Sequence, residues 1–141
     1  MIGRYPAKLD DKNRLFVPAK LRQELGDDFY VTLGVNCGHR CLTVYTAAEW
    51  QRVVDHFNSL PITASRSLRY FMGNVWQIEP DKQGRFLLPE SLRTFAGIDQ
   101  DVIFLGLGGR AEIWAAERYE AEEPEHLTPE AIEQALKELG F

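Results

Sequence analysis

The chain has 141 residues, of which 45% are hydrophobic, and it contains eight Phe, five Tyr and three Trp. This length fits a single domain with a proper core, and the share of apolar and aromatic residues excludes a disordered chain. No apolar run approaches the roughly 18–20 residues that span a bilayer, and the sequence does not open on a signal peptide. We therefore expect a cytoplasmic protein with no membrane partner.

The net charge of −5 conceals an uneven distribution along the chain. From Glu112 to the end, nine acidic residues stand against two basic ones, a net of −7, which leaves +2 for residues 1–111. At the start of the chain, six basic residues outnumber three acidic ones: Arg4, Lys8, Lys12, Arg14, Lys20 and Arg22 against Asp10, Asp11 and Glu24. A chain of this kind can bind a polyanion with one face only.

One sequence pattern occurs twice, about half a chain apart. Residues 10–18 read Asp-Asp-Lys-Asn-Arg-Leu-Phe-Val-Pro, and residues 81–89 read Asp-Lys-Gln-Gly-Arg-Phe-Leu-Leu-Pro. Each copy has an acid, three residues, an arginine, three apolar residues and a proline, and a Leu-Arg pair follows. Such a repeat predicts one supersecondary unit present twice. Each unit has an arginine beside a tight turn, so the two turns make a paired surface.

The repeated segment predicts two short strands joined by a turn. In the first copy we expect a strand at residues 5–9, a turn at 11–13 and a second strand at 15–17 that pairs with the first. Asn13 and Gly84 occupy matching turn positions, and both residue types accept a left-handed backbone at low cost. The same turn geometry is therefore expected in both copies.

Helices and hairpins follow each repeat. Short helices are predicted at residues 19–25 and 90–96, since each run follows a proline suited to the first turn of a helix and precedes a glycine suited to a C-cap. After each helix, two β-rich runs separated by a glycine-containing turn predict a hairpin. These runs are residues 29–33 with 42–45, and residues 102–105 with 112–114.

Further helices are predicted after the hairpins and at the end of the chain. One covers residues 47–57, its counterpart begins at 115–119, and a connecting helix covers 64–72. A last helix starts at Thr128, where a cap residue, a proline and an early acid follow in order. It has one narrow apolar stripe, which must dock on its own subunit or on a neighbour: Ile132, Ala135, Leu136 and Leu139.

The duplicated D-x-K-G-R-x-x-x-P pattern, with a helix and a hairpin in each half, resembles the MraZ family of bacterial transcriptional regulators. That family belongs to the AbrB/SpoVT-like swapped-hairpin DNA-binding proteins, and the resemblance covers roughly Ile2 to Tyr119. It implies an α+β fold in which two tandem AbrB-like halves form a pseudo-twofold swapped-hairpin barrel. The repeats then span residues 4–50 and 75–119, joined by a helical segment at 51–74 and followed by an acidic helical tail at 120–141.

The resemblance also implies a function. It implies a sequence-specific repressor, without a cofactor and without enzymatic activity, whose partner is double-stranded DNA. Such a protein binds repeated promoter sites of its own operon in the division and cell-wall gene cluster. It assembles into a homo-oligomeric ring, an octamer or a dodecamer, and associates with the nucleoid.

Carried over by position, the DNA-reading loops fall on the two copies of the pattern. We expect six residues to contact DNA: Lys8, Lys12, Asn13, Arg14, Lys82 and Arg85. Gly84 shapes the second turn, while Asp10 and Asp81, which are acceptors only, hold the turns by accepting backbone N–H bonds and so aim the arginines. The copies depart from the pattern at Asn13, where the family has glycine, and at Gln83, where it has lysine. The resemblance therefore supports a phosphate-binding role less strongly for the second loop than for the first.

The residues around each loop sharpen this difference. Lys8, Lys20 and Arg22 flank the first loop in the sequence, whereas Glu79 and Glu90 dilute the charge of the second. A lone arginine in a turn is usually just solvated. The duplication within a matching unit favours DNA contact instead.

Other functions have weaker support in the sequence. An AbrB-like antitoxin with a toxin-binding tail is the second hypothesis, but it normally carries one copy of the motif. Cys37 and Cys41 enclose His39 without a clear fourth metal ligand, so we expect a polar turn with Cys41 packed inward rather than a metal site, a metal-dependent enzyme or a disulfide. No nucleophile motif occurs, and residues 106–109 suit a hairpin turn rather than a phosphate-binding loop.

Overall fold

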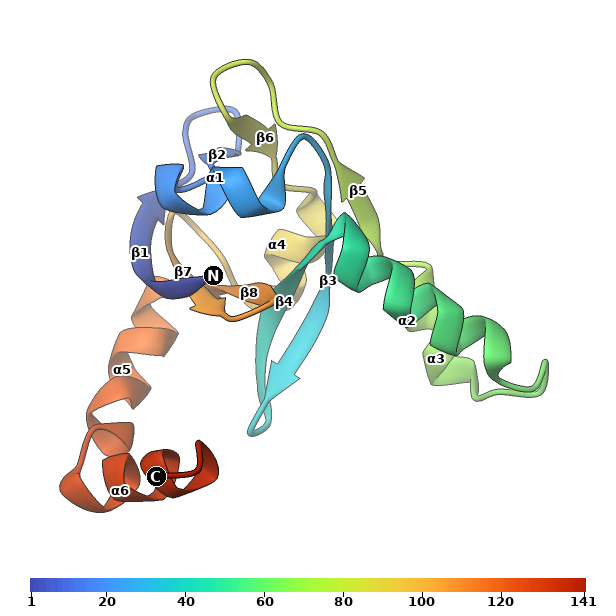
Figure 1. The fold of residues 1–141 in the computed structure, drawn as a ribbon. Coiled ribbons are helices and arrows are strands. Elements are labelled where there is room, and N and C mark those ends of the chain that lie inside the picture. The colour runs from blue at the N-terminus through green and yellow to red at the C-terminus, as the bar shows by residue number, and fades with distance from the viewer.

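The computed structural model describes residues 1–141, and the two halves of the chain have the same order of elements (Figure 1). The first half contains β1 (Ile2–Lys8), β2 (Arg14–Phe16), α1 (Ala19–Leu25), β3 (Phe29–Asn36), β4 (His39–Thr46) and α2 (Ala47–Ser59). The second contains β5 (Trp76–Ile78), β6 (Arg85–Leu87), α4 (Glu90–Ala96), β7 (Asp101–Leu107), β8 (Arg110–Ala115) and α5 (Ala116–His126). α3 (Arg66–Met72) lies between the halves, and α6 (Pro129–Glu138) ends the chain. The α+β class is confirmed.

The strands form two antiparallel sheets that mix the two halves. One sheet has six strands in the order β1-β7-β8-β4-β3-β5, and the other is a ribbon of β2 and β6. In the large sheet, β1 pairs with β7 and β4 pairs with β8, so strands from both halves share one ladder. This sheet ends at β1 and β5, and the pairing therefore does not form the closed barrel that we expect from the resemblance.

β2 does not pair with β1, so the predicted pairing of the first two strands is wrong. β2 pairs with β6 of the other half, in the register Arg14 to Leu87, Leu15 to Phe86 and Phe16 to Arg85. Reciprocal bonds extend the ribbon: the Val17 N–H donates to the Gly84 carbonyl at 2.8 Å, and the Leu88 N–H donates to the Asn13 carbonyl at 2.9 Å. Each half thus supplies one strand of a shared ribbon.

The core lies beneath this ribbon. Successive residues of a strand point to opposite faces, so Leu15 and Phe86 are 0% and 4% exposed while Phe16 and Leu87 are 48% and 60% exposed. The Phe86 ring meets Phe29 edge to face, with centroids 5.4 Å apart. The same cluster takes apolar residues from both halves, among them Val17, Leu21, Leu88, Leu92 and Phe104. The inner face of the ribbon therefore packs on the core, and its outer face is exposed.

The predicted helices and hairpins next to the ribbon are confirmed. α1 and α4 have the predicted bounds, and Gly26 and Gly97 cap their C-terminal ends with φ of 72° and 66°. Pro18 and Pro89 occupy the N-cap positions, just before the first turn. β3 pairs with β4 and β7 with β8 as hairpins.

Two helical arms extend away from this core on different sides (Figure 1). The first consists of α2 and α3, and Trp50 anchors its base by stacking on Tyr30 at 5.4 Å. The second consists of α5 and α6, where α5 continues beyond the predicted residues and contains Pro124. Thr128 caps α6 as predicted, since its Oγ1 accepts the Ala131 N–H at 3.2 Å. None of the helices combines the length and the apolar character that crossing a membrane requires.

Candidate nucleic-acid interface

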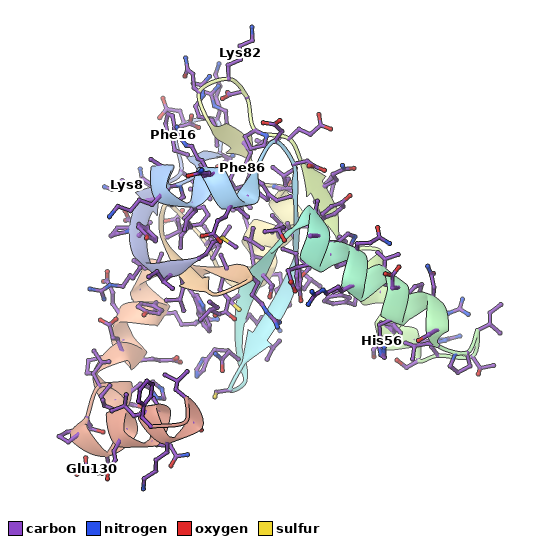
Figure 2. The ribbon with its side chains drawn as sticks, viewed as in Figure 1. Lys8, Phe16, His56, Lys82, Phe86 and Glu130 are labelled. Carbon is purple, nitrogen blue, oxygen red and sulfur yellow. The ribbon has the colours of Figure 1, made fainter.

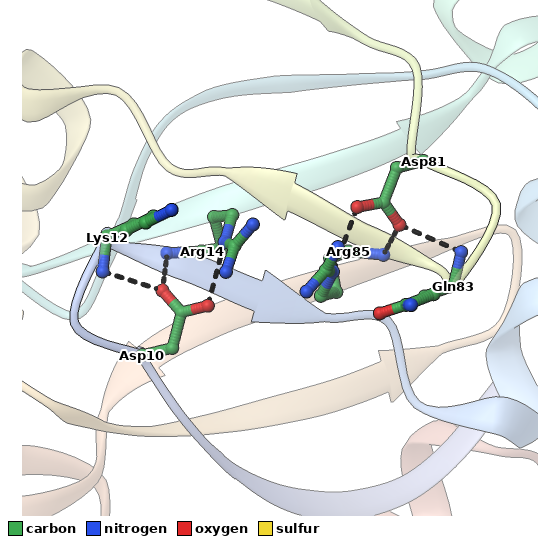
Figure 3. Close-up of polar contacts among 6 residues, drawn as sticks. All are labelled: Asp10, Lys12, Arg14, Asp81, Gln83 and Arg85. Atoms are coloured by element: carbon green, nitrogen blue, oxygen red, sulfur yellow. Dashed lines mark hydrogen bonds and ion pairs between the residues drawn. The ribbon is translucent and has the colours of Figure 1, made fainter.

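The outer face of the β2–β6 ribbon carries both repeat arginines. Arg14 and Phe16 of β2 share this face with Arg85 and Leu87 of β6, because each of them alternates with a buried residue. In an antiparallel pair, Arg14 and Arg85 are diagonal neighbours across the two strands. Figure 3 shows the two side chains near the centre of the ribbon, each beside the loop of its own copy. One exposed face therefore presents two guanidinium groups.

The first loop is closed by the carboxylate of Asp10. Its Oδ1 accepts the backbone N–H groups of Lys12 and Arg14, both at 2.9 Å, and its Oδ2 accepts the Arg14 Nε at 2.8 Å. Asn13 completes the turn with a φ of 59°. The Arg14 backbone N–H bond is the main cause that lowers the pKa of Asp10 below its ordinary value. The charged carboxylate thus fixes both the turn and the arginine.

The second loop repeats this geometry at Asp81. Its Oδ1 accepts the backbone N–H groups of Gln83 and Arg85, and its Oδ2 accepts the Arg85 Nε, each at 2.9 Å (Figure 3). Gly84 provides the turn with a φ of 82°. The Arg85 backbone N–H bond is again the main cause that lowers the pKa of Asp81. The two copies therefore hold their arginines in the same way.

This arrangement leaves the terminal nitrogens of both arginines available. Arg14 and Arg85 each donate from Nε to an aspartate, and no protein acceptor takes their Nη groups. The two side chains are 30% and 24% exposed. A guanidinium held in this way offers a fixed pair of N–H donors, which suits a phosphate or the O6 and N7 atoms of guanine.

The lysines of the predicted site differ in their surroundings. Lys12 and Lys82 are exposed on the two loops and form no ion pair. Figure 2 shows Lys82 pointing away from the molecule at the tip of its loop. Lys8 lies at the end of β1, where its Nζ is 3.6 Å from the Oδ1 of Asp101. A phosphate would therefore compete with a carboxylate at Lys8, but not at Lys12 or Lys82.

Arg22 occupies a place that the sequence does not reveal. The sequence associates it with the first loop, but its guanidinium lies against Gly84 of the second. The Arg22 Nε donates to the Val17 carbonyl at 2.8 Å, which holds the side chain between the halves. This position follows from the pairing of β2 with β6. Local spacing contains no signal for it.

The remaining candidates lie elsewhere in the fold. Cys37 is exposed in the β3–β4 turn, while Cys41 is fully buried as predicted, and burial raises the pKa of its thiol to about 12. No group of three or more His, Cys, Asp or Glu side chains is arranged to hold a metal ion. Residues 106–109 include the turn between β7 and β8, where Gly108 has a φ of 77°, as predicted.

Comparison with known proteins shows the family to which the chain belongs. The family model described as "MraZ protein, putative antitoxin-like" matches residues 1–69 and 71–137. The chain belongs to the MraZ family. The resemblance is thus confirmed, and the MraZ match continues beyond Tyr119 into the acidic tail.

Curated members of the MraZ family match along most of their length. The Transcriptional regulator MraZ of Clostridium beijerinckii is 37% identical over 143 residues, which covers 99% of each chain. The protein of the same name from Lachnoclostridium phytofermentans is 39% identical over 142 residues, 99% of this chain and 97% of the relative. That of Caldanaerobacter subterraneus subsp. tengcongensis is 41% identical over 123 residues, 85% and 84% of the two chains.

Proposed function

We propose that this protein is a sequence-specific DNA-binding repressor of its own operon in the division and cell-wall gene cluster. The observation that carries the proposal is the pair of matching loops, which hold Arg14 and Arg85 on one exposed face with free Nη donors. Its relatives are named transcriptional regulators, which supports a role in transcription. Such a role is exerted on the nucleoid, in the cytoplasm.

In the proposed mechanism, the ribbon faces the major groove of DNA. That groove admits a two-stranded β-ribbon, and an arginine fork fits the O6 and N7 acceptors of guanine. Arg14 and Arg85 read bases, whereas Lys12, Lys82 and Asn13 meet phosphates and set the register. Lys8 contributes only after it leaves Asp101. The aspartates aim the arginines without touching DNA.

We infer that the two halves are tandem repeats, at residues 4–50 and 75–119, that interlock as swapped hairpins about an approximate twofold axis. Residues 51–74 connect them and residues 120–141 form a separate tail. The exchange of bonds between Val17 and Gly84, and between Leu88 and Asn13, supports this symmetry. Two equivalent loops within one subunit suit a DNA site with two similar elements.

We further propose assembly into a homo-oligomeric ring, with an octamer or a dodecamer as the sizes implied by the family. One subunit offers few DNA contacts, and neighbouring subunits on spaced repeats make each later contact effectively intramolecular. The apolar stripe of α6 is exposed at Ile132, Leu136 and Leu139. Residues 56–78 in and after the α2–α3 arm contain two arginines and no acid, while the other arm is strongly acidic. Packing of α6 on the α2–α3 arm of the next copy is heterologous, as a ring requires.

Fluorescence anisotropy tests the DNA-binding proposal. Labelled DNA from upstream of the gene is compared with a scrambled duplex over a salt series, for the wild type and Arg14→Ala. We expect a salt-sensitive preference for the upstream DNA that the variant loses. Binding of neither duplex by the wild type would sink the proposal.

An antitoxin is the second candidate, because the description of the matching family includes that term. Deletion of residues 128–141 separates the two functions. An antitoxin would lose a partner protein and keep its full affinity for promoter DNA. The proposed repressor would keep its affinity for a single site and lose the gain from repeated sites.

A further inference from the structure

The two loops differ in the position of their lysine. In the first loop, Lys12 lies two residues before Arg14, whereas Gln83 holds the matching position before Arg85. Lys82 is one residue earlier, and its side chain points away from the molecule at the tip of the loop (Figure 2). The second loop therefore has no cation at the position that Lys12 holds in the first loop.

Two arginines, one in each half, make matching hydrogen bonds beside the ribbon. Arg22 of α1 donates from Nε to the Val17 carbonyl at 2.8 Å, and Arg93 of α4 donates from Nε to the Leu88 carbonyl at 3.2 Å. The N–H groups of these two acceptor residues bond to Gly84 and Asn13 respectively. Arg22 and Arg93 are thus matched by the approximate symmetry of the fold.

The match ends at the turn residue. A Cβ added to Gly84 would lie 2.6 Å from Cζ, 2.7 Å from Nε and 2.9 Å from Nη2 of Arg22. The guanidinium therefore fills the space that any side chain at this position would need. Asn13 has a side chain at the equivalent position of the first loop. The absence of a side chain at Gly84 is therefore what lets an arginine lie directly against the backbone of the second loop.

The Arg22 side chain is available to a ligand in this place. It is exposed, it pairs with no carboxylate, and its Nη groups have no protein acceptor. It borders an open groove of about 380 Å³ whose lining includes Gln23, Asp27, Asp81, Lys82 and Gly84. The carboxylate of Asp81 is already engaged by Arg85, and Lys82 brings a second cation to the groove.

We propose that Arg22 contacts a DNA backbone phosphate at the second loop and replaces the lysine that is missing at Gln83. The inference rests on the proposed DNA-binding function and extends it. The second loop is then completed by the first half of the chain. Arg93 has no such role in the proposal, because Asn13 has a Cβ at the position where Gly84 leaves room for Arg22.

The test is the salt dependence of binding to upstream DNA, measured by anisotropy for four forms of the full chain. These are the wild type, Arg22→Ala, Arg93→Ala and Arg22→Ala combined with Gln83→Lys. One phosphate contact contributes about 0.9 to the slope of log K against log salt. We expect Arg22→Ala to reduce the slope by about that amount, Arg93→Ala to leave it unchanged and Gln83→Lys to restore it. Both single variants lose an equivalent Nε bond, so Arg93→Ala controls for structural damage.

A second pair of variants serves if Arg22→Ala impairs folding. Gly84→Asn keeps Arg22 but displaces its guanidinium. Gly108→Asn is the matched control, because Gly108 also has a positive φ and a Cβ added there meets nothing within 4 Å. The slope should fall for Gly84→Asn and not for Gly108→Asn. Two outcomes would overturn this inference alone, provided that the wild type binds normally. In the first, the slope is unchanged for Arg22→Ala and Gly84→Asn. In the second, Arg22→Ala and Arg93→Ala reduce the slope equally. Failure of the wild type to bind any duplex would overturn the proposed function together with it.

Discussion

Single residues determine what the outer face of the ribbon can recognise. Arg14 and Arg85 each donate one hydrogen bond, from Nε, to an aspartate, and their Nη groups have no protein acceptor. Arg85 is further restrained by the Phe16 ring, whose centroid lies 6.0 Å from its Cζ. A side chain fixed before binding loses little rotamer freedom when it meets a base. The aspartates therefore contribute to recognition by preorganisation.

Removal of a repeat arginine should affect specific binding most. Arg14→Ala is expected to weaken binding to the upstream DNA by ~1–3 kcal/mol, the range for a bidentate base contact. Lys12→Ala should weaken binding to all sequences alike and reduce the salt slope, as the loss of a phosphate contact does. Anisotropy titrations on specific and scrambled duplexes measure both effects. Equal losses on the two duplexes for Arg14→Ala would argue against base reading.

Acid should loosen the loops through Asp10 and Asp81. The folded loops lower the pKa of both carboxyl groups from the ordinary value of 3.8, chiefly through the backbone N–H groups of Arg14 and Arg85. Their stabilisation is therefore fully present above pH 3.8 and is lost as the pH falls through the lowered folded-state values. A variant with Asp10→Asn and Asp81→Asn should be less stable than the wild type at neutral pH and lose less stability below about pH 4.

Urea unfolding over a pH series measures this difference. The same steepness of acid destabilisation in the variant and the wild type would show that other carboxyl groups dominate. Asp11→Asn is the matched control, since Asp11 lies in the same loop and accepts none of the bonds that close it.

At the scale of elements, the ribbon has one face for stability and one for binding. Leu15→Ala should destabilise the protein by ~2–5 kcal/mol, because it leaves a cavity beneath the ribbon. Phe16→Ala, one residue further, should change stability by within about 0.5 kcal/mol, since that side chain is 48% exposed. Urea unfolding of the two variants compares neighbouring positions on the same strand. Similar losses for both would mean that the outer face is also packed, for example in an assembly.

The sequence predicts the elements of this fold well, because their signals are local. The bounds of α1 and α4 follow from the prolines and glycines around them, and the alternation of buried and exposed residues follows from the strand period. The Asp10 loop could also be described in advance, because an aspartate two residues before a backbone N–H is suited to accept its hydrogen bond. Each of these features depends on residues within one short segment.

The pairing of the elements could not be predicted in the same way. Leu15 in β2 and Phe86 in β6 have the same pattern of neighbouring residues in the sequence. Either strand could therefore form backbone hydrogen bonds with the other or with a strand nearer in the sequence. Backbone hydrogen bonds carry little information about which strand is the partner. The place of Arg22 beside Gly84 depends on that pairing, so the residues near Arg22 in the sequence do not predict it.

At the scale of the whole molecule, the charge is divided between the parts of the fold. The loop that carries Lys82 lies at one end of the molecule, while α5 and α6 extend from another side and carry most of the acidic excess, Glu130 among them (Figures 1 and 2). An acidic protein can bind a polyanion if its acidic arm is directed away from the duplex. The same arm carries an exposed apolar stripe, which needs a partner of its own.

Disruption of that stripe should separate assembly from DNA binding. The double substitution Ile132→Ser and Leu136→Ser is expected to reduce the assembly to smaller species in light scattering coupled to size exclusion, because it removes the apolar surface of α6. Affinity for a single DNA site should be unchanged, since the loops are intact, while the gain from repeated sites should fall. Glu133→Ser, an exposed position outside the stripe on the same helix, is the control. An unchanged assembly in the double variant would move the subunit contact to another surface, with Ile62 at the tip of the α2–α3 arm as the next position to substitute.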